Sequence, residues 1–228
     1  MSLEMEAYQV RFWLTQISPL IWRRFLVNPS STTIADLHYF IQIAMRWQDF
    51  HLHEFIIQGK AYGISYVGGI CFGDDPHKIT LQDLKLREKE RFFYKYNFYI
   101  PWKVEIRLEK ILPMNLKSIY PKCIAGNNIA PSENYNNFMD FLVKQPTKFI
   151  DGMDRLIEDL RKIKKQGGAS VEAIKDKIME ISSWINQHKF SRKNLNDKLK
   201  QYAKGQFSLE DLIEEEDDYD EEEVALCE

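Results

Sequence analysis

The first half of the chain contains short stretches in which aromatic or β-branched residues alternate with polar ones, a pattern typical of β-strands. Turn signals such as Ser18-Pro19 and Asn28-Pro29 bound these stretches. Strands are therefore predicted over residues 8–14, 21–27, 53–58, 91–99 and 104–111. The first two are close enough in sequence to pair as a hairpin.

One helix is predicted between the second and third strands, because apolar residues from Ile34 onward recur every three or four positions. Thr32 or Thr33 can cap its start, and we expect it to end near Arg46. The resulting order, β-β-α-β-β-β, predicts an α+β fold. We expect a mixed β-sheet with the helix packed on one face, in a β-grasp-like arrangement.

The chain changes character after this α+β core, which is predicted over residues 1–112. Residues 113–137 are rich in Pro, Asn, Gly and Ser and predict a long loop. Residues 138–205 show helical periodicity, and Ser191 can cap the last of the helices, so we expect an all-helical extension. Residues 206–228 are predicted to form an acidic, disordered tail.

The composition is that of a folded chain: 44% of its 228 residues are hydrophobic and 13% aromatic, enough for a packed core. No apolar run approaches the roughly 18 residues of a membrane-spanning helix, and the first residues do not resemble a secretory signal. Cys71, Cys123 and Cys227 are widely spaced and form no C-x-x-C motif, which argues against disulfides. A cytoplasmic, reducing location is therefore expected.

Charge is distributed unevenly, although the net charge is only −3. Residues 1–140 hold 16 Lys and Arg against 14 Asp and Glu, residues 141–208 hold 15 against 8, and residues 209–228 hold 12 acidic residues and no basic one. The basic segment can supply contacts to phosphates, and the candidate residues are Arg161, Lys162, Lys164, Lys165, Arg192 and Lys193. The acidic tail can compete for that surface. The alternative is that these basic residues simply lie on solvent-exposed helix faces and that the tail only increases solubility.

Two arginines, Arg23 and Arg24, follow Trp22 on a predicted strand. Because successive residues of a strand face opposite sides, only one of the two can join a given surface. That arginine is a candidate for an anion contact beside a stacking aromatic ring, and an ordinary solvated arginine is the alternative. The aromatic strand at 91–99 similarly favours either base stacking on an open sheet or a buried core.

The segment 47–55, WQDFHLHEF, carries the candidate metal ligands His51 and His53. Cys71 and His77 from the following loop can complete a zinc-type set, although no H-x-x-x-H or C-x-x-C spacing supports it. The alternative is that both histidines form hydrogen bonds at the junction between helix and strand. No nucleophile elbow, phosphate loop or cofactor motif is present, so no catalytic residue and no cofactor is assigned.

Several motifs carry a resemblance to a known family: P-x-I-W-R-R, L-H-x-x-I-Q-x-A-M-x-W-x-D-x-H-L-H-E-F, KITLQDL and YKYNFYIPWKVEIRLEKIL. Over roughly residues 6–140 the chain is similar to the root-inducing-plasmid ORF-three-like family, whose members also occur as passenger proteins of insertion elements. The resemblance implies an α+β domain linked to mobile DNA, with a largely unestablished biochemical role.

Two features of that family are missing here. Tyr99-Ile100-Pro101 replace its acidic turn before Trp102, and Val104 stands where the family commonly has a histidine. Ala130 and Tyr135 stand where it commonly has two cysteines, and Cys123 remains further upstream. Any chemistry or metal that those residues carry in relatives is therefore expected to be absent.

Together these patterns favour a non-enzymatic binding module. It would contact nucleic acid or a protein of a mobile element through the basic helical extension, with the acidic tail as a modulator. The alternative is an enzyme or a metal-binding domain centred on His51, His53 and residues 71–77. No membrane partner is expected, and the oligomeric state is left open.

Overall fold

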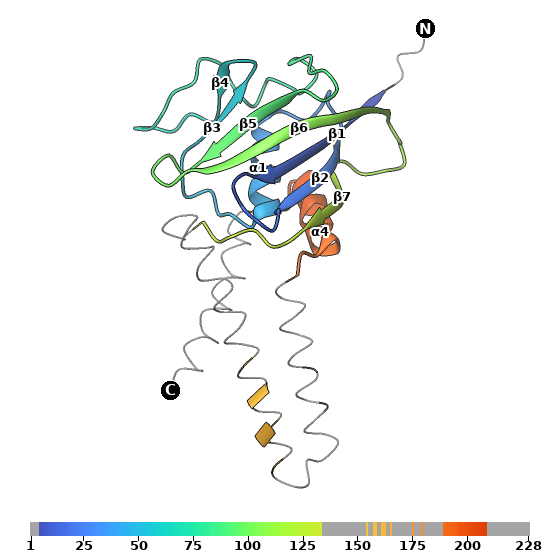
Figure 1. Ribbon diagram of the computed structural model, residues 1–228. Helices are drawn as coiled ribbons and strands as arrows, with labels where there is room; N and C mark the ends of the chain where they lie inside the picture. The colour runs from blue at the N-terminus through green and yellow to red at the C-terminus, as the bar shows by residue number, and fades with distance from the viewer. Residues whose placement is uncertain are drawn as a thin grey trace. The chain divides into compact units, whose positions relative to one another are not determined.

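Figure 1 shows the computed structural model, which describes residues 5–133 and 189–208. Eight further positions are described singly and are helical: 154, 157, 158, 161, 162, 165, 175 and 179. The chain divides into two compact units, residues 1–134 with 191–228, and residues 135–190. The strands and helices below all belong to the first unit.

Seven strands form one sheet in the order β4-β3-β5-β6-β1-β2-β7. Their bounds are Glu6–Leu14 (β1), Trp22–Val27 (β2), His53–Ile57 (β3), Lys60–Tyr62 (β4), Arg91–Tyr96 (β5), Trp102–Pro113 (β6) and Lys122–Asn127 (β7). All six neighbouring pairs of this described sheet are antiparallel. The α+β class is thus confirmed, but the expected mixed sheet is wrong, and the pairing does not confirm a β-grasp topology.

The strand β7 lies inside the segment 113–137 that was predicted to be a loop, and it pairs with β2 at the edge of the sheet. Its sequence, KCIAGN, buries only Cys123 and lacks the apolar alternation that marks the other strands. An edge strand covered on one side needs little apolar surface, so the pattern that reveals the central strands is absent here.

The helix α1, Ile34–Met45, lies behind the sheet in Figure 1 and covers one face of it. It begins where it was predicted to: Thr33 and Asp36 form a capping box, which satisfies two of the free N–H groups at the helix start. Phe40 from the helix stacks on Phe25, whose ring in turn stacks on Phe12 with centroids 5.0 Å apart. These aromatic contacts fix the helix against β1 and β2.

The helix α4, Arg192–Ala203, begins at the predicted cap Ser191 and packs on the same unit. The Asn196 side chain forms two hydrogen bonds with the backbone of Cys123: its Oδ1 accepts from the N–H at 2.8 Å, and its Nδ2 donates to the carbonyl at 2.9 Å. The Tyr202 hydroxyl donates to Asp36 at the start of α1 at 2.8 Å. The last helix of the predicted extension therefore belongs with the sheet, because its buried stripe and these bonds face β7 and α1.

The remainder of the predicted extension, 138–190, lies outside the described residues apart from the eight helical positions and residues 189 and 190. The same is true of residues 209–228, which hold most of the predicted acidic tail. In the part of the chain that the structure describes, no helix has the length and apolarity that a membrane span requires.

Candidate functional site

The two arginines singled out in the sequence lie on opposite sides of β2. Arg23 points inward, is 2% exposed, and donates through Nη1 to the carbonyls of Trp22 and Asn127 at 2.9 and 2.8 Å. Burial lowers the pKa of its guanidinium to about 10. Arg24 points to the other face, which α1 does not cover, and is only half-buried. Of this pair, only Arg24 can meet a partner on the open face.

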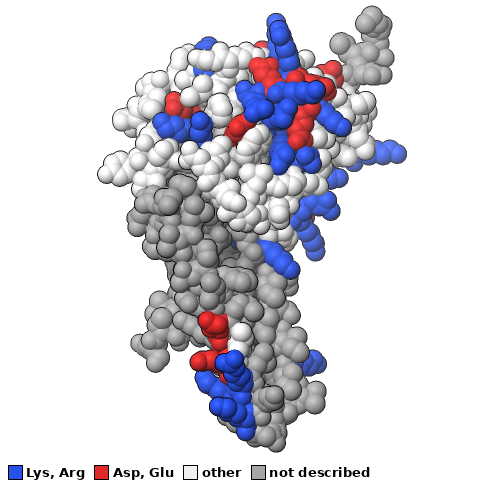
Figure 2. All heavy atoms as spheres, in the orientation of Figure 1, with Lys and Arg blue, Asp and Glu red and all other residues white. Residues whose placement is uncertain are grey.

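Arg24 is one end of a row of arginines that crosses four adjacent strands. The pairing register places Arg24 of β2 opposite Arg11 of β1, Arg11 opposite Arg107 of β6, and Arg107 opposite Arg91 of β5. Neighbouring strands lie about 4.8 Å apart, so the row spans about 14 Å. We call these four residues the arginine row. Figure 2 shows Lys and Arg gathered over this face, with some carboxylates among them.

The ends of the arginine row are paired with carboxylates, and its middle is not. Arg24 makes a two-pronged contact with Glu109, at 2.5 Å through Nε and 2.9 Å through Nη2. Arg91 donates to Glu105 at 3.1 Å. Among the described residues, no carboxylate forms an ion pair with Arg11 or Arg107. The centre of the row therefore carries positive charge that no described carboxylate takes up in an ion pair, although Glu109 interacts electrostatically with Arg11.

Glu109 is held as a carboxylate by the residues around it. Burial acts to raise its pKa, but the hydrogen bonds from Arg24 and Gln9 outweigh burial and hold the pKa below its usual value. Because this carboxylate stays charged and accepts both prongs of Arg24, that guanidinium is fixed in position. Arg24 is thus a fixed end of the row, while Arg11 and Arg107, which form no ion pair with a described carboxylate, are available to a ligand.

Aromatic rings flank the row on the same face. Trp13 and Trp22 are direct cross-strand neighbours. The Arg11 guanidinium lies 4.6 Å from the Trp22 ring centroid and 5.5 Å from that of Trp13, and Arg24 lies 5.2 Å from Trp22. Such cation–π contacts hold arginine side chains in place without neutralising their charge. The next outward pair along these strands is Phe93 opposite Glu105, and the one after it is Lys95 opposite Lys103, where Lys95 forms an ion pair with Glu54.

The basic candidates near the C-terminus are less informative. Arg161, Lys162 and Lys165 are exposed and helical, and Lys164 lies outside the described residues. Arg192 and Lys193 are exposed at the start of α4, where Arg192 donates to the Ile124 carbonyl at 3.0 Å. Sequence reasoning missed Arg11, Arg91 and Arg107. Each occupies an outward position of its strand, but only the pairing register shows that they align.

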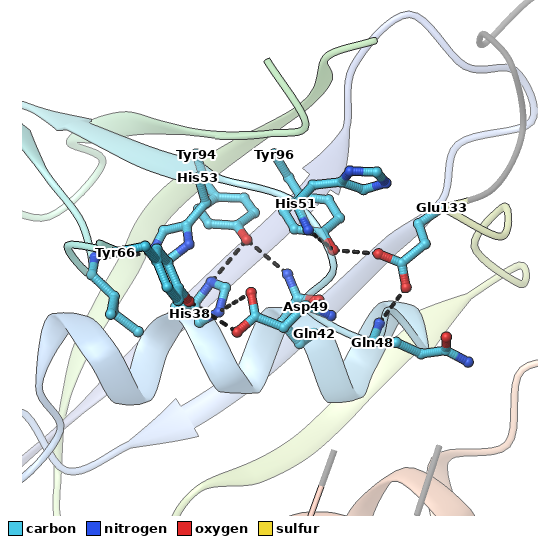
Figure 3. Close-up of polar contacts among 11 residues, drawn as sticks. His38, Gln42, Gln48, Asp49, His51, His53, Tyr66, Tyr94, Tyr96 and Glu133 are labelled. Carbon is cyan, nitrogen blue, oxygen red and sulfur yellow. Dashed lines mark hydrogen bonds and ion pairs between the residues drawn. The ribbon is translucent and has the colours of Figure 1, made fainter. Parts of the chain in front are cut away.

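A second polar cluster is buried between α1 and the sheet, as Figure 3 shows. Tyr94 of β5 receives a hydrogen bond from the Gln42 side chain at 2.8 Å, and its hydroxyl lies 2.9 Å from His38 Nδ1. Since Gln42 donates to the hydroxyl oxygen, the single hydroxyl proton is free to bond His38 Nδ1. That arrangement places the His38 ring proton on Nε2, which lies 3.0 Å from Asp49 Oδ1.

His53 of β3 lies directly against His38. The two rings are stacked, with centroids 3.7 Å apart and planes 15° from parallel. Burial and, to a smaller extent, the neighbouring His38 lower the pKa of His53 to about 2, so His53 is neutral. Its Nε2 accepts the backbone N–H of Ile64 at 3.3 Å. The Tyr66 hydroxyl donates to Asp49 Oδ2 at 3.1 Å from the same loop.

The four candidate metal ligands of the sequence are not brought together as one group. His51 is half-buried with its ring edge-on to Tyr96, and Cys71 and His77 are exposed. Within the described ranges, the one group of three potential ligands with converging atoms is His38, Asp49 and His53. The sequence contained a signal for His38. His38 and Gln42 lie four and eight residues after Ile34, on the apolar stripe of the helix that begins there. The backbone at Asp49, with φ of 58°, gave no such signal.

Glu133 forms a further group of buried polar contacts on the face of the sheet that α1 covers, and its role is structural. Its carboxylate accepts hydrogen bonds from the Tyr96 hydroxyl and the Gln48 N–H, both drawn in Figure 3. Trp47 donates to the Pro131 carbonyl at 2.9 Å. Together these bonds fasten residues 131–133 to the end of α1.

The described positions where the family pattern is broken differ in burial: Val104 and Ala130 are buried, whereas Tyr99 is 93% exposed. Val104 is fully buried. Cys123 is also buried, and burial raises the pKa of its thiol to about 11, so the thiol is protonated at neutral pH.

The fold and these two sites define an α+β domain with one antiparallel sheet, an arginine-rich open face and a histidine–aspartate cluster beneath its helix. Residues 6–146 match the family described as plasmid pRiA4b ORF-3-like protein, and the chain belongs to that family. This confirms the resemblance seen in the sequence.

Two relatives extend the comparison. An uncharacterised protein, y4hQ, of Sinorhizobium fredii (strain NBRC 101917 / NGR234) is 28% identical over 112 residues, which are 46% of this chain and 54% of that protein. The chain thus spans about half the length of this relative. The crystal structure of a protein of unknown function, MM3350 from Methanosarcina mazei Go1, is similar with a TM-score of 0.51 and 27% identity, covering 77% of this chain and 89% of that one. Neither description names an activity.

Proposed function

We propose that this protein is a non-enzymatic binding module for single-stranded nucleic acid, whose phosphates are bound by the arginine row. The observation that carries the proposal is the alignment of four arginines directly opposite one another on four adjacent strands of an open sheet face. Like charges placed opposite each other destabilise a sheet, so an arrangement of this kind is favoured where an anion binds to it.

The shape of the site favours a polyanion over a small anion. The row is about 14 Å long at the usual strand spacing, which is too long for a single phosphate to contact both ends. Arginine forms paired hydrogen bonds with phosphate, and Arg11 and Arg107 at the centre have no described carboxylate in the way. Trp13 and Trp22 lie half-buried beside the row, in contact with the Arg11 and Arg24 guanidinium groups, and the part of each ring that stays exposed would contact bases that a single strand leaves unpaired.

The basic helical extension and the acidic tail have secondary parts in this proposal. Residues 141–208 carry a large excess of basic residues and would add contacts to the same strand of nucleic acid. The 12 acidic residues of 209–228 would compete with phosphates for the basic surfaces and so weaken binding. A cytosolic location and a link to mobile DNA fit this role and stay predictions.

The test is a binding titration of full-length protein with a fluorescent single-stranded oligonucleotide at several salt concentrations. Arg11→Gln and Arg107→Gln each remove one charge from the middle of the row. Lys78→Gln is the matched control, because Lys78 is exposed on the loop beside the start of α1, on the covered side of the sheet. A chain ending at Ser208 tests the tail.

Each row variant is expected to weaken binding about tenfold and to reduce the slope of log affinity against log salt by about 0.7. Lys78→Gln should leave both unchanged, and removal of the tail should tighten binding. Equal affinities for the row variants and the control would exclude the arginine row. Binding that depends instead on Arg161, Lys162 and Lys165 would assign the contact to the helical extension, and no binding at low salt would point to a protein partner.

A further inference from the structure

The cluster of His38, Asp49 and His53 offers two nitrogens and one oxygen that converge in the interior. One ligand atom from each residue lies within 4.8 Å of those from the other two. His38 and His53 are 0% and 1% exposed, so water has little access to either ring. Two imidazoles and a carboxylate are a donor set that binds zinc and similar divalent ions.

Each of the three side chains also keeps a buried polar atom without a hydrogen-bond partner in the described part of the chain. These atoms are His38 Nε2, Asp49 Oδ1 and His53 Nδ1. The first two lie 3.0 Å apart, within the distance of an ion pair but without a hydrogen bond. Buried polar atoms in native proteins nearly always have a partner, so three such atoms in one cluster indicate a ligand that binds between them.

The opposite atoms of His38 and Asp49 are, in contrast, held by hydrogen bonds, and that of His53 has one longer contact. Tyr94 contacts His38 Nδ1 at 2.9 Å, Tyr66 donates to Asp49 Oδ2 at 3.1 Å, and the Ile64 N–H lies 3.3 Å from His53 Nε2. In metal sites, hydrogen bonds of this kind to the remote atoms of the ligands orient them toward the ion. Figure 3 shows these partners arranged around the cluster.

We propose that His38, Asp49 and His53 bind one divalent metal ion of the zinc type. The Asp49 side chain remains 12% exposed, which leaves a side on which a water molecule can complete a tetrahedral set. The site is separate from the arginine row, which lies on the other face of the sheet, and it does not depend on nucleic-acid binding.

Binding requires one ring to turn, and the contacts identify which. An ion lies in the plane of each imidazole that binds it, so two stacked, nearly parallel rings cannot share one. His38 is fixed between Tyr94 and Asp49, whereas His53 has one long contact, to Ile64. His53 therefore turns, its Nε2 releases the Ile64 N–H and takes up the ring proton, and Nδ1 becomes the ligand. His38 binds through Nε2, so its ring proton moves to Nδ1, which then donates to the Tyr94 hydroxyl oxygen.

The test uses full-length protein freed of metal with a chelator and then titrated with cobalt(II), whose visible absorption reports a tetrahedral site. Asp49→Asn removes the charged ligand while keeping its shape, and His53→Gln removes the ring that turns. His77→Ala and Cys71→Ser are the controls, because both residues are exposed and lie outside the cluster. Thermal unfolding in the absence of metal identifies any variant that does not fold.

One equivalent of cobalt should bind, zinc should displace it, and the Ile64 amide should shift in NMR spectra as its bond to His53 is lost. Asp49→Asn should weaken binding at least tenfold, and the control variants should bind like the parent chain. Absence of binding by the parent chain would overturn the proposal and leave an internal water as the occupant. Loss of binding in His77→Ala or Cys71→Ser would overturn it in favour of the four residues expected from the sequence.

Discussion

On the face covered by α1, the Tyr94 hydroxyl accepts a hydrogen bond from Gln42 and lies at hydrogen-bond distance from His38. Its hydrogen-bonding capacity is therefore satisfied even though it is buried. On the open face, Arg11 has an arginine opposite it on both neighbouring strands. The covered face must satisfy its polar groups internally because water cannot reach them. The open face can tolerate repulsion because water and salt screen it. An arrangement that repels where it could be neutral therefore points to a partner, whereas a buried hydroxyl satisfied within the protein, as that of Tyr94 is, points first to stability.

The largest effect should come from the aromatic packing of the covered face. Phe25→Ala removes a ring that is 1% exposed and stacks with both Phe12 and Phe40, so we expect a loss of about 3–5 kcal/mol in the free energy of unfolding. Chemical denaturation measures this change. Leu26→Ala, the next residue on β2 and only half-buried, is the comparison from the open face. A similar loss in both variants would mean that the two faces are not distinguished by burial.

The covered face should also make stability depend on pH through His53. Its pKa is about 2 in the folded protein against 6.5 for an ordinary histidine, so only the unfolded chain takes up a proton between these values. The stability that His53 contributes is therefore complete above about pH 6.5 and is lost as pH falls, by at most about 1.4 kcal/mol per pH unit.

Denaturation of the metal-free chain between pH 7 and pH 5 measures this dependence. His53→Gln should flatten the slope by about one proton relative to the parent chain, whereas His77→Ala, which removes an exposed histidine, should not. An unchanged slope in His53→Gln would show that the ring is protonated, or reached by water, in the folded state.

A smaller loss is expected from the polar network itself. Tyr94→Phe keeps the ring, which is 0% exposed, but leaves His38 Nδ1 and the Gln42 amide without their partner, at a cost of about 1–3 kcal/mol. Tyr99→Phe removes the hydroxyl of a tyrosine that is 93% exposed and should change stability little. Equal stabilities for the two variants in thermal unfolding would mean that a buried water takes over the bonds of Tyr94.

The sequence predicts one of these faces much better than the other. The alternation of apolar and polar residues along β1 and β2 predicts that Phe12 and Phe25 point inward. The residue types of Thr33 and Asp36 alone predict the capping box at the start of α1. These signals are local. The arginine row is not local, because Arg11 and Arg107 are neighbours only through the pairing of β1 with β6.

The cluster of His38, Asp49 and His53 is only partly predictable from the sequence. His38 can be inferred from its place on the buried stripe of α1, but its partner Asp49 depends on a left-handed backbone turn after the helix. That turn is held by a hydrogen bond from the Asp49 N–H to Gln42 Oε1 at 3.1 Å, a contact no sequence pattern specifies. The pair His51 and His53 stood out in the sequence because the two are close along the chain, yet only His53 faces His38.

The smallest effect on stability is expected from the arginine row, and it is the most informative for function. Arg107→Gln removes a charge that lies opposite two other arginines, so its effect should be within about 0.5 kcal/mol and, at low salt, stabilising. Denaturation at low and high salt measures this, because screening should erase the gain. Lys78→Gln, which removes an exposed lysine paired with Asp75, should show no such gain. If Arg107→Gln were instead strongly destabilising at both salt concentrations, the row would be a structural element of the sheet, and its alignment would no longer argue for an anionic ligand.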